Sequence, residues 1–210
     1  MTAIWPKSGV FENQGPGLRE QEGSCRPLIP RGKEILGRVI QMVRPIVKYP
    51  EPVLQRPAAP VTEFNDELRT LIDDMFESMY AAQGIGLAAP QIGVSKRITV
   101  LDLSFQKNPE DKIVLINPEI TFKQGKQYGE EGCLSLPDIH EKVSRAAVVK
   151  LRAQTPEGEW REYDGEELLA RAFQHEIDHL DGILFIFRVS ALKRDLIQRR
   201  IRKLQKTGEW

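Results

Sequence analysis

Residues 174–182 read QHEIDHLDG and place two histidines four positions apart, with Glu176 directly after the first. Positions i and i+4 of a helix lie on the same face, so His175 and His179 can direct imidazole nitrogens to one metal ion. The His-Glu-x-x-His pattern on a helix is typical of zinc hydrolases. The stretch therefore predicts a metal-binding helix; the alternative is a surface helix whose histidines are solvated.

Such a site needs a third protein ligand. Zinc proteases with this motif take it from a downstream His or Glu, but no histidine follows His179 here, and Asp195 and Glu209 belong to a basic region. Upstream, Cys133 lies in EEGCLSLP, and one thiolate with two imidazoles leaves a fourth coordination position open. His140 would close that position, so we do not expect it to bind the metal. A small buried cysteine is the alternative reading of Cys133.

A third unusual stretch is GIGLAAPQIG, residues 84–93. It does not match a phosphate-binding loop, because Lys and Ser/Thr are missing from the required places. Its small and apolar residues indicate a close backbone approach to another kind of ligand. The amide of Gln91 also offers N–H donors to a developing oxyanion. The alternative is a plain loop that leaves the preceding helix.

Together, GIGLAAPQ (84–91), EGCLS (131–135) and QHEIDHLDG (174–182) resemble the three ordered signature motifs of bacterial peptide deformylases. The resemblance extends from about Met42 to the C-terminus, and the basic helical end is more similar to the type 1 branch than to forms with an added strand. The residues alone leave two other hypotheses open. One is a zincin-like endopeptidase, and the other is a non-catalytic protein with a structural metal.

The resemblance implies a metal-dependent hydrolase that removes the N-formyl group from the N-terminal formyl-methionine of newly synthesised proteins and releases formate. It implies a metal held by Cys133, His175 and His179, most often Fe²⁺ in the family, with zinc and other divalent ions also found. Glu176 would act as general base and then general acid. One departure is His140, because the family often has an arginine seven residues after the metal cysteine.

The resemblance also implies how the substrate is held. The Gln91 side chain and the backbone N–H of Leu134 would stabilise the tetrahedral oxyanion together with the metal. Ile85 and Gly86 would pair with the extended backbone of the substrate, and Leu168 is a candidate for the apolar pocket that takes the methionine side chain.

Helical periodicity appears in three stretches of the chain, which are 64–82, 165–180 and a basic segment from about Ala191 after Ser190. Asn65 or Thr62 can cap the first helix. For the second, Asp164 and Glu167 are placed as a capping box, and Gly182 suits the position after the helix.

Strand patterns cover residues 97–103 and 113–118, and a hairpin is predicted for 146–154 and 159–165 around TPEG. Strands and helices do not alternate regularly, which predicts an α+β fold. With the resemblance, we expect small antiparallel or mixed β-sheets packed around a central metal-binding helix. An amphipathic helix in the N-terminal half and a C-terminal helix complete this fold.

Residues 1–41 hold scattered Gly and Pro without a sustained period. We read them as a loosely ordered extension, or as the result of a start codon assigned too far upstream, and residues 42–210 as the catalytic domain. Cys25 and Cys133 are too few for a disulfide framework. Because the chain also lacks a signal-peptide core and a membrane-length apolar run, we expect a cytoplasmic protein with no membrane partner.

The formal net charge is +0, but the charge is unevenly distributed. Residues 188–206 contain eight Lys or Arg and one acid, whereas the remainder carries 22 basic and 29 acidic residues. The chain as a whole therefore does not resemble a sequence-specific DNA-binding protein. For the basic segment 190–206 we weigh a solvated helix face against contact with ribosomal RNA near the site where nascent chains emerge.

Overall fold

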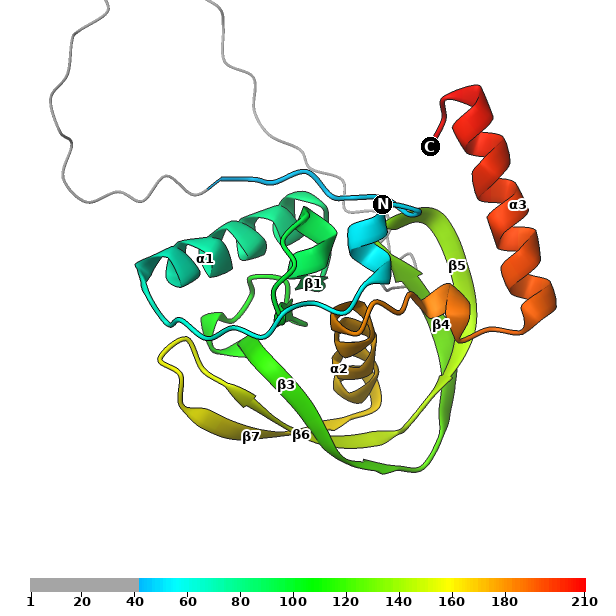
Figure 1. Ribbon diagram of the computed structural model, residues 1–210. Coiled ribbons are helices and arrows are strands. Elements are labelled where there is room, and N and C mark those ends of the chain that lie inside the picture. The colour runs from blue at the N-terminus through cyan, green and yellow to red at the C-terminus, as the bar shows by residue number, and fades with distance from the viewer. Residues whose placement is uncertain (1–41) are drawn as a thin grey trace, which may run out of the picture. The chain divides into compact units, whose positions relative to one another are not determined.

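The computed structural model describes residues 42–210, and in it a central helix lies between a long sheet and a separate hairpin (Figure 1). The elements are η1 Pro52–Gln55, α1 Asp66–Ala81, β1 Gly86–Ala88, η2 Ala89–Ile92, β2 Ile98–Asp102, η3 Pro109–Asp111, β3 Lys112–Gln124, β4 Gln127–Cys133, β5 Leu136–Arg145, β6 Val148–Gln154, β7 Trp160–Glu166, α2 Glu167–Leu180, η4 Phe185–Phe187 and α3 Ala191–Thr207. The predicted extension 1–41 lies outside the described residues.

The larger sheet has five antiparallel strands in the order β1-β2-β3-β6-β7. Strand β3 joins its two halves, because its first residues pair with β2 and its later residues with β6. The pairing shifts between Ile116 and Glu119, where Asn117 has φ +49° and its side-chain amide bonds both backbone groups of Val61. Both strand predictions and the hairpin prediction are confirmed, although β3 extends beyond 113–118.

Strands β4 and β5 form a second, two-stranded antiparallel sheet, which the sequence patterns did not reveal. Helix α2 packs against β7, β1, β2 and β6 of the large sheet. Its Arg171 and His175 side chains contact Glu131 of β4. Eleven of its residues are buried, from Ala170 to Leu180. An apolar core of β-strand and α2 side chains, among them Leu115, Val149 and Phe173, fills the space beneath it. The expected α+β fold with a central helix is therefore confirmed.

The predicted capping box of α2 is wrong. Asp164 lies in β7, where its side chain pairs with Lys150 at 2.9 Å, and the helix begins only at Glu167. The cap position is Glu166, which makes no side-chain capping bond. The physical reason is that β7 pairs with β6 as far as Glu166 opposite Val148, so the strand ladder continues directly into the helix without a capping turn.

The end of α2 is as predicted, because Gly182 follows the C-terminal cap with φ +74°. This left-handed conformation is accessible to glycine at no steric cost. A Cβ atom on Gly182 would also lie 2.8 Å from backbone atoms of Gln55 and Arg56. The chain just after η1 therefore presses directly on the end of the metal-binding helix.

The other two helices begin where the sequence places them. The Asn65 side chain accepts the backbone N–H of Leu68 at the start of α1, and the Ser190 side chain accepts that of Lys193 at the start of α3. Helix α3 buries Ile197 and Ile201 against the hairpin side of the molecule. Among the described residues, no helix is both long and apolar enough to cross a membrane.

Two helical leucines test the core. Leu68 of α1 is 1% exposed, whereas Leu196 of α3 is 57% exposed. We expect Leu68→Ala to lower the free energy of unfolding by about 2–5 kcal/mol, because it removes buried methyl groups and leaves a cavity. The matched Leu196→Ala change should stay within about 0.5 kcal/mol. Urea denaturation measures both; equal losses would contradict the assigned core.

Candidate metal centre and active site

Three buried donors converge from two elements. Cys133 is the last residue of β4, and His175 and His179 lie one turn apart on α2. The sulfur and one ring nitrogen of each histidine all lie within 4.8 Å of one another, and the Cys133 Sγ to His179 Nε2 distance is 3.2 Å. One thiolate and two imidazoles form a donor set that suits a divalent transition-metal ion. The three predicted metal ligands are therefore brought together, and they fit such an ion.

The orientation of His175 is set by Glu131. The Glu131 Oε2 atom lies 3.0 Å from His175 Nδ1, which leaves the opposite ring nitrogen to face the other donors. Arg145 and Arg171 both donate to the same carboxylate, at 2.9 and 2.6 Å. Burial alone would raise the pKa of Glu131, but the bonds from His175 and Arg145 outweigh it and hold this pKa well below its ordinary value. Glu131 is therefore a buried, ionised group.

Glu176 lies on the same helix and faces the first strand of the large sheet. It is 1% exposed, and its Oε2 atom accepts a hydrogen bond from Thr99 Oγ1 at 3.3 Å. Burial raises the pKa of Glu176 to about 7, although His175 and Thr99 oppose the shift. The carboxyl group can therefore both take up and release a proton near neutral pH.

Gly86 permits the close approach between β1 and Glu176. A Cβ atom at Gly86 would lie 2.5 Å from Glu176 Oε1 and 2.9 Å from Leu101 Cδ2. The glycine-rich stretch is thus partly a strand and not only a loop, because Gly86–Ala88 form β1 at the edge of the sheet. The carbonyl of Ile85 accepts the N–H of Asp102 in β2. Successive residues of an antiparallel strand direct their backbone groups to opposite sides, so the N–H and C=O of Gly86 point away from β2, toward the free edge of the sheet.

Gln91 lies on η2 and is 2% exposed. Its Oε1 atom accepts the backbone N–H of Ala88 at 2.8 Å, which fixes the orientation of the amide. The Nε2 atom consequently faces Cys133 Sγ at 3.5 Å and Ser135 Oγ at 3.4 Å. A fixed N–H donor therefore points at the donor cluster, where a substrate oxygen could accept it.

The remaining predicted site residues differ in their exposure. Leu134 follows Cys133 and is half-buried against the core that contains α1. Ile85 is 8% exposed, whereas Leu168, in the first turn of α2, is 36% exposed. Leu168 is thus the most open of the predicted substrate contacts. His140 is not among the three clustered donors.

Comparison with known proteins identifies the architecture. The family model described as polypeptide deformylase matches residues 43–195, which is most of the chain. The chain belongs to this family. Its members are metal-dependent hydrolases, and all three predicted donors of this chain lie within the matched residues.

Individual relatives agree. A peptide deformylase of Acidobacterium capsulatum is 76% identical over 169 residues, which cover 80% of this chain and 99% of that protein. One of Alkalilimnicola ehrlichii is 49% identical over 163 residues, covering 78% and 91%. The crystal structure of a peptide deformylase from Legionella pneumophila superposes with a TM-score of 0.74 at 44% identity and covers 80% of this chain and 98% of its own.

Several polar residues of the deformylase site were not identified from the sequence. Glu131 lies two residues before Cys133, and the alternation of side chains along a strand could have placed both on one face. Ser135 and Thr99 carry no such local signal, because their contacts with Gln91 and Glu176 depend on the folded arrangement.

Glu131 should contribute strongly to the stability of the fold. Glu131→Gln removes the carboxylate that pairs with the buried Arg171 and one of the two that pair with the buried Arg145, and we expect it to lower the free energy of unfolding by about 3–5 kcal/mol. The matched control is Glu119→Gln, because Glu119 also pairs with an arginine, Arg152, but both side chains are about half exposed. That control should cost at most about 1 kcal/mol. Urea denaturation compares them, and a Glu131 variant as stable as the control would refute this role.

Proposed function

We propose that this chain hydrolyses the N-formyl amide of formyl-methionyl chain ends and releases formate, acting on newly made proteins in the cytoplasm. The observation that carries the proposal is the buried Cys133, His175 and His179 cluster with Glu176 beside it, facing the free edge of β1. An endopeptidase with the same helix motif would take its third ligand downstream. Here the third donor is a cysteine from the hairpin, and family membership supports the deformylase assignment.

The metal is proposed to be one Fe²⁺ per chain, with zinc or another divalent ion as an alternative occupant of the same ligands. Cys133, His175 and His179 would hold it. A bound ion of this kind lowers the pKa of a coordinated water from 15.7 to about 7 and polarises the carbonyl that is attacked. The thiolate donor supports a redox-active, oxygen-sensitive iron form.

Glu176 is proposed to move the proton. Its carboxyl group accepts a proton as water attacks the formyl carbon, and it returns this proton to the amine that leaves. A pKa of about 7 suits both steps, because neither protonation state is strongly disfavoured near neutral pH. The hydrogen bond from Thr99 and the contact with Gly86 would hold the carboxyl group in place between the two steps.

Gln91 and Leu134 are proposed to stabilise the oxyanion. The Gln91 Nε2 donor already points at the donor cluster because Ala88 fixes the other end of its amide. The backbone N–H of Leu134 adjoins Cys133 in sequence and would supply a second donor. Preorganised donors of this type stabilise the transition state without reorganisation, and each is worth on the order of 3 kcal/mol.

The substrate is proposed to bind as an additional strand at the edge of β1. The outward N–H and C=O of Gly86 would pair with its backbone, as in other cases of strand addition to a sheet. The backbone of Ile85, next to Gly86, would also pair with the substrate, and Leu168 would contact the methionine side chain. Residues 42–210 would form the whole catalytic domain.

The role of Glu176 can be separated from metal binding. We expect Glu176→Ala to keep its metal, because no donor atom is altered, but to lower kcat/KM for a formyl-Met-Ala-Ser peptide by roughly 10²- to 10⁴-fold. Anaerobic purification, metal analysis and a formate-release assay measure both quantities. The exposed Glu63→Ala change is the control and should leave both unchanged.

Two results would oppose this assignment. A Glu176→Ala enzyme that releases formate at the wild-type rate would remove the proposed proton carrier. Cleavage of casein without formate release by the wild-type enzyme would favour an endopeptidase instead.

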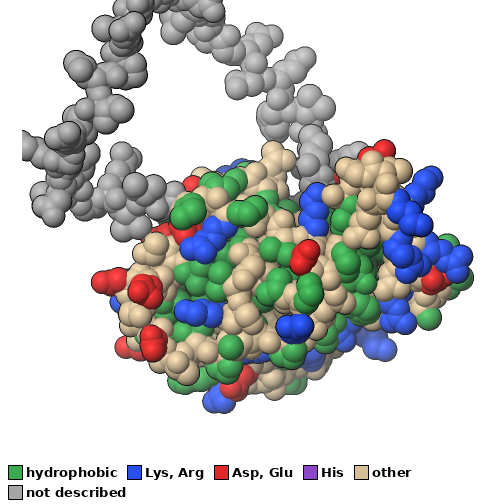
Figure 2. All heavy atoms as spheres, turned by 45° about the horizontal axis from the view of Figure 1, so that its top comes forward, with side chains coloured by type: hydrophobic (Ala, Val, Ile, Leu, Met, Phe, Trp, Pro, Cys, Tyr) green, Lys and Arg blue, Asp and Glu red, His purple; other side chains and the backbone are tan. Residues whose placement is uncertain are grey.

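A second proposal concerns the ribosome. Helix α3 exposes Arg200, Arg202 and Lys203, and Figure 2 shows Lys and Arg side chains gathered over this helix. Deleting the helix would remove the buried Ile197 and Ile201 and disturb the core that they contact. Reversing exposed charges tests the basic surface without this loss. Such a basic surface would contact the phosphates of ribosomal RNA with a marked salt dependence.

We expect Arg200→Glu with Lys203→Glu to weaken binding to purified ribosomes at least about tenfold at low salt. The control reverses Lys107 and Arg161, which are exposed on other elements. Sedimentation at increasing KCl concentrations measures the effect. Equal binding by wild type and the α3 variant would leave α3 as a solvated helix face.

A further inference from the structure

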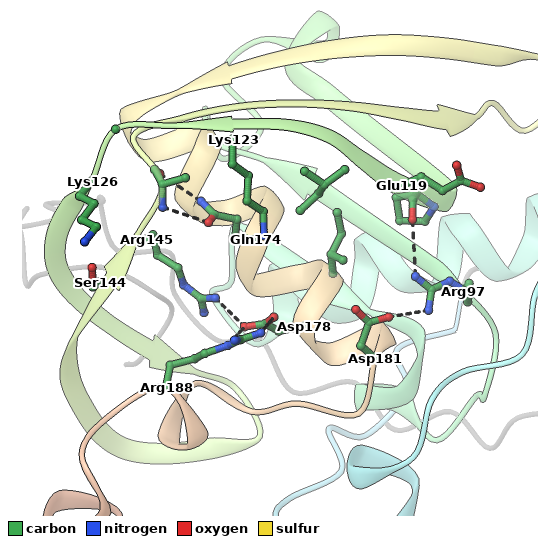
Figure 3. A pocket seen from close by; sticks show the side chains of 15 residues that line it. Arg97, Glu119, Lys123, Lys126, Ser144, Arg145, Gln174, Asp178, Asp181 and Arg188 are labelled. Atoms are coloured by element: carbon green, nitrogen blue, oxygen red, sulfur yellow. Dashed lines mark hydrogen bonds and ion pairs between the residues drawn. The ribbon is translucent and has the colours of Figure 1, made fainter.

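A second hollow lies on a face of α2 that the metal donors do not use (Figure 3). Its volume is about 590 Å³, within the range of about 300–1,000 Å³ that is usual for ligand pockets. Helix α2 forms one side through Gln174, Ile177, Asp178 and Asp181, and the end of β3 with the turn into β4 forms another. None of the proposed catalytic or substrate-binding residues lines it.

The acidic side chains of this hollow are already neutralised. Each of its three carboxylates forms an ion pair: Asp181 with Arg97, Asp178 with Arg145 and Arg188, and Glu119 with Arg152. These acids therefore place little uncompensated negative charge in the hollow.

The lysines of the hollow are not neutralised. Within residues 42–210, the side chains of Lys123 and Lys126 form neither ion pairs nor hydrogen bonds. Gly125, with φ +67°, forms the turn between them and keeps the two close along the chain. Figure 3 shows Lys123 reaching from β3 toward α2. Two ammonium groups thus provide a local excess of positive charge.

Arg188 provides a third donor. Its Nε and Nη2 atoms bind the two carboxylate oxygens of Asp178, and this bidentate pair holds the guanidinium plane fixed. The Nη1 atom has no hydrogen-bond partner among residues 42–210, and 43% of the side chain is exposed. A fixed guanidinium with one free donor, on the same hollow as two unpaired lysines, is a suitable environment for an oxyanion.

The rest of the lining consists mainly of apolar side chains and of polar side chains that already form hydrogen bonds within the protein. Ile120 contributes partly exposed apolar surface, whereas Pro118 and Ile177 are buried beneath it. The Gln174 amide already bonds backbone groups of Ala146 and Ala170, so it offers little to a ligand. The hollow therefore combines an anion-binding rim with an apolar wall against which a sugar ring can pack.

We propose that this hollow is a second binding site, which takes a phosphate group on Lys123, Lys126 and Arg188 and packs the attached sugar against Ile120. The phosphate belongs either to an RNA backbone or to a free sugar phosphate. No proposed metal donor, catalytic residue or substrate-binding residue lines the hollow, and Arg145 reaches the deformylase site only through Glu131, so the second site does not rest on the proposed hydrolysis.

The test uses the full chain and two phosphate sources. Ribose 5-phosphate represents the free source, with ribose as the unphosphorylated control, and a fluorescein-labelled RNA of ten nucleotides represents the backbone. Chemical-shift and anisotropy titrations compare wild type with Lys123→Gln/Lys126→Gln. The matched control is Lys48→Gln/Lys142→Gln, which removes two exposed lysines outside the hollow.

We expect Lys123→Gln/Lys126→Gln to bind at least one probe about tenfold or more weakly, while the control pair binds like wild type. A selective loss of RNA binding assigns the backbone phosphate, and a selective loss of ribose 5-phosphate binding assigns the free one. Both variants should release formate at the wild-type rate, which shows that they are folded. The proposal is overturned if neither probe binds better than ribose, or if wild type and Lys123→Gln/Lys126→Gln bind equally.

Discussion

The carboxylate of Glu131 joins the hairpin, the central helix and the metal ligands. Its oxygens accept hydrogen bonds from Arg145 of β5 and Arg171 of α2, and one of them contacts the ring of His175; all of these side chains are buried. A buried charge of this kind is tolerated only when every partner is present. The same group therefore attaches β4 and β5 to α2 and turns His175 toward Cys133. The donor cluster can therefore assemble correctly only when the β4–β5 hairpin is in place against α2.

A second constraint acts on the opposite side of the cluster. Glu176 lies against Gly86 in β1 and accepts a hydrogen bond from Thr99 in β2, so the large sheet positions the proposed proton carrier. The hairpin supplies Cys133 and orients His175 through Glu131. Helix α2 supplies residues to both. The active site thus lies where two sheets meet one helix, and its geometry depends on rigid elements more than on loops.

The sequence predicted those parts of the molecule whose determinants are local. Helical spacing placed His175 and His179 together, and side-chain caps located the starts of α1 and α3. The start of α2 was misplaced because a strand ladder, which is a non-local interaction, holds Asp164 to Glu166 in β7. The hairpin of β4 and β5 and the roles of Thr99 and Ser135 were missed for the same reason. Cys133 was found because the metal site required a third donor and because EGCLS (131–135) resembles a family motif.

Gly182 illustrates a consequence for interpreting genetic data. It makes no contact with the proposed substrate site, yet its φ of +74° and the backbone of Gln55 and Arg56 at 2.8 Å leave no room for a side chain. In a saturation-mutagenesis screen scored by growth, this position should be as intolerant as the metal donors. Intolerance to substitution at Gly182 would reflect how the end of α2 packs on the chain around Gln55 and Arg56, and not a role in catalysis. Such screens therefore need a separate measure of protein abundance before they can define an active site.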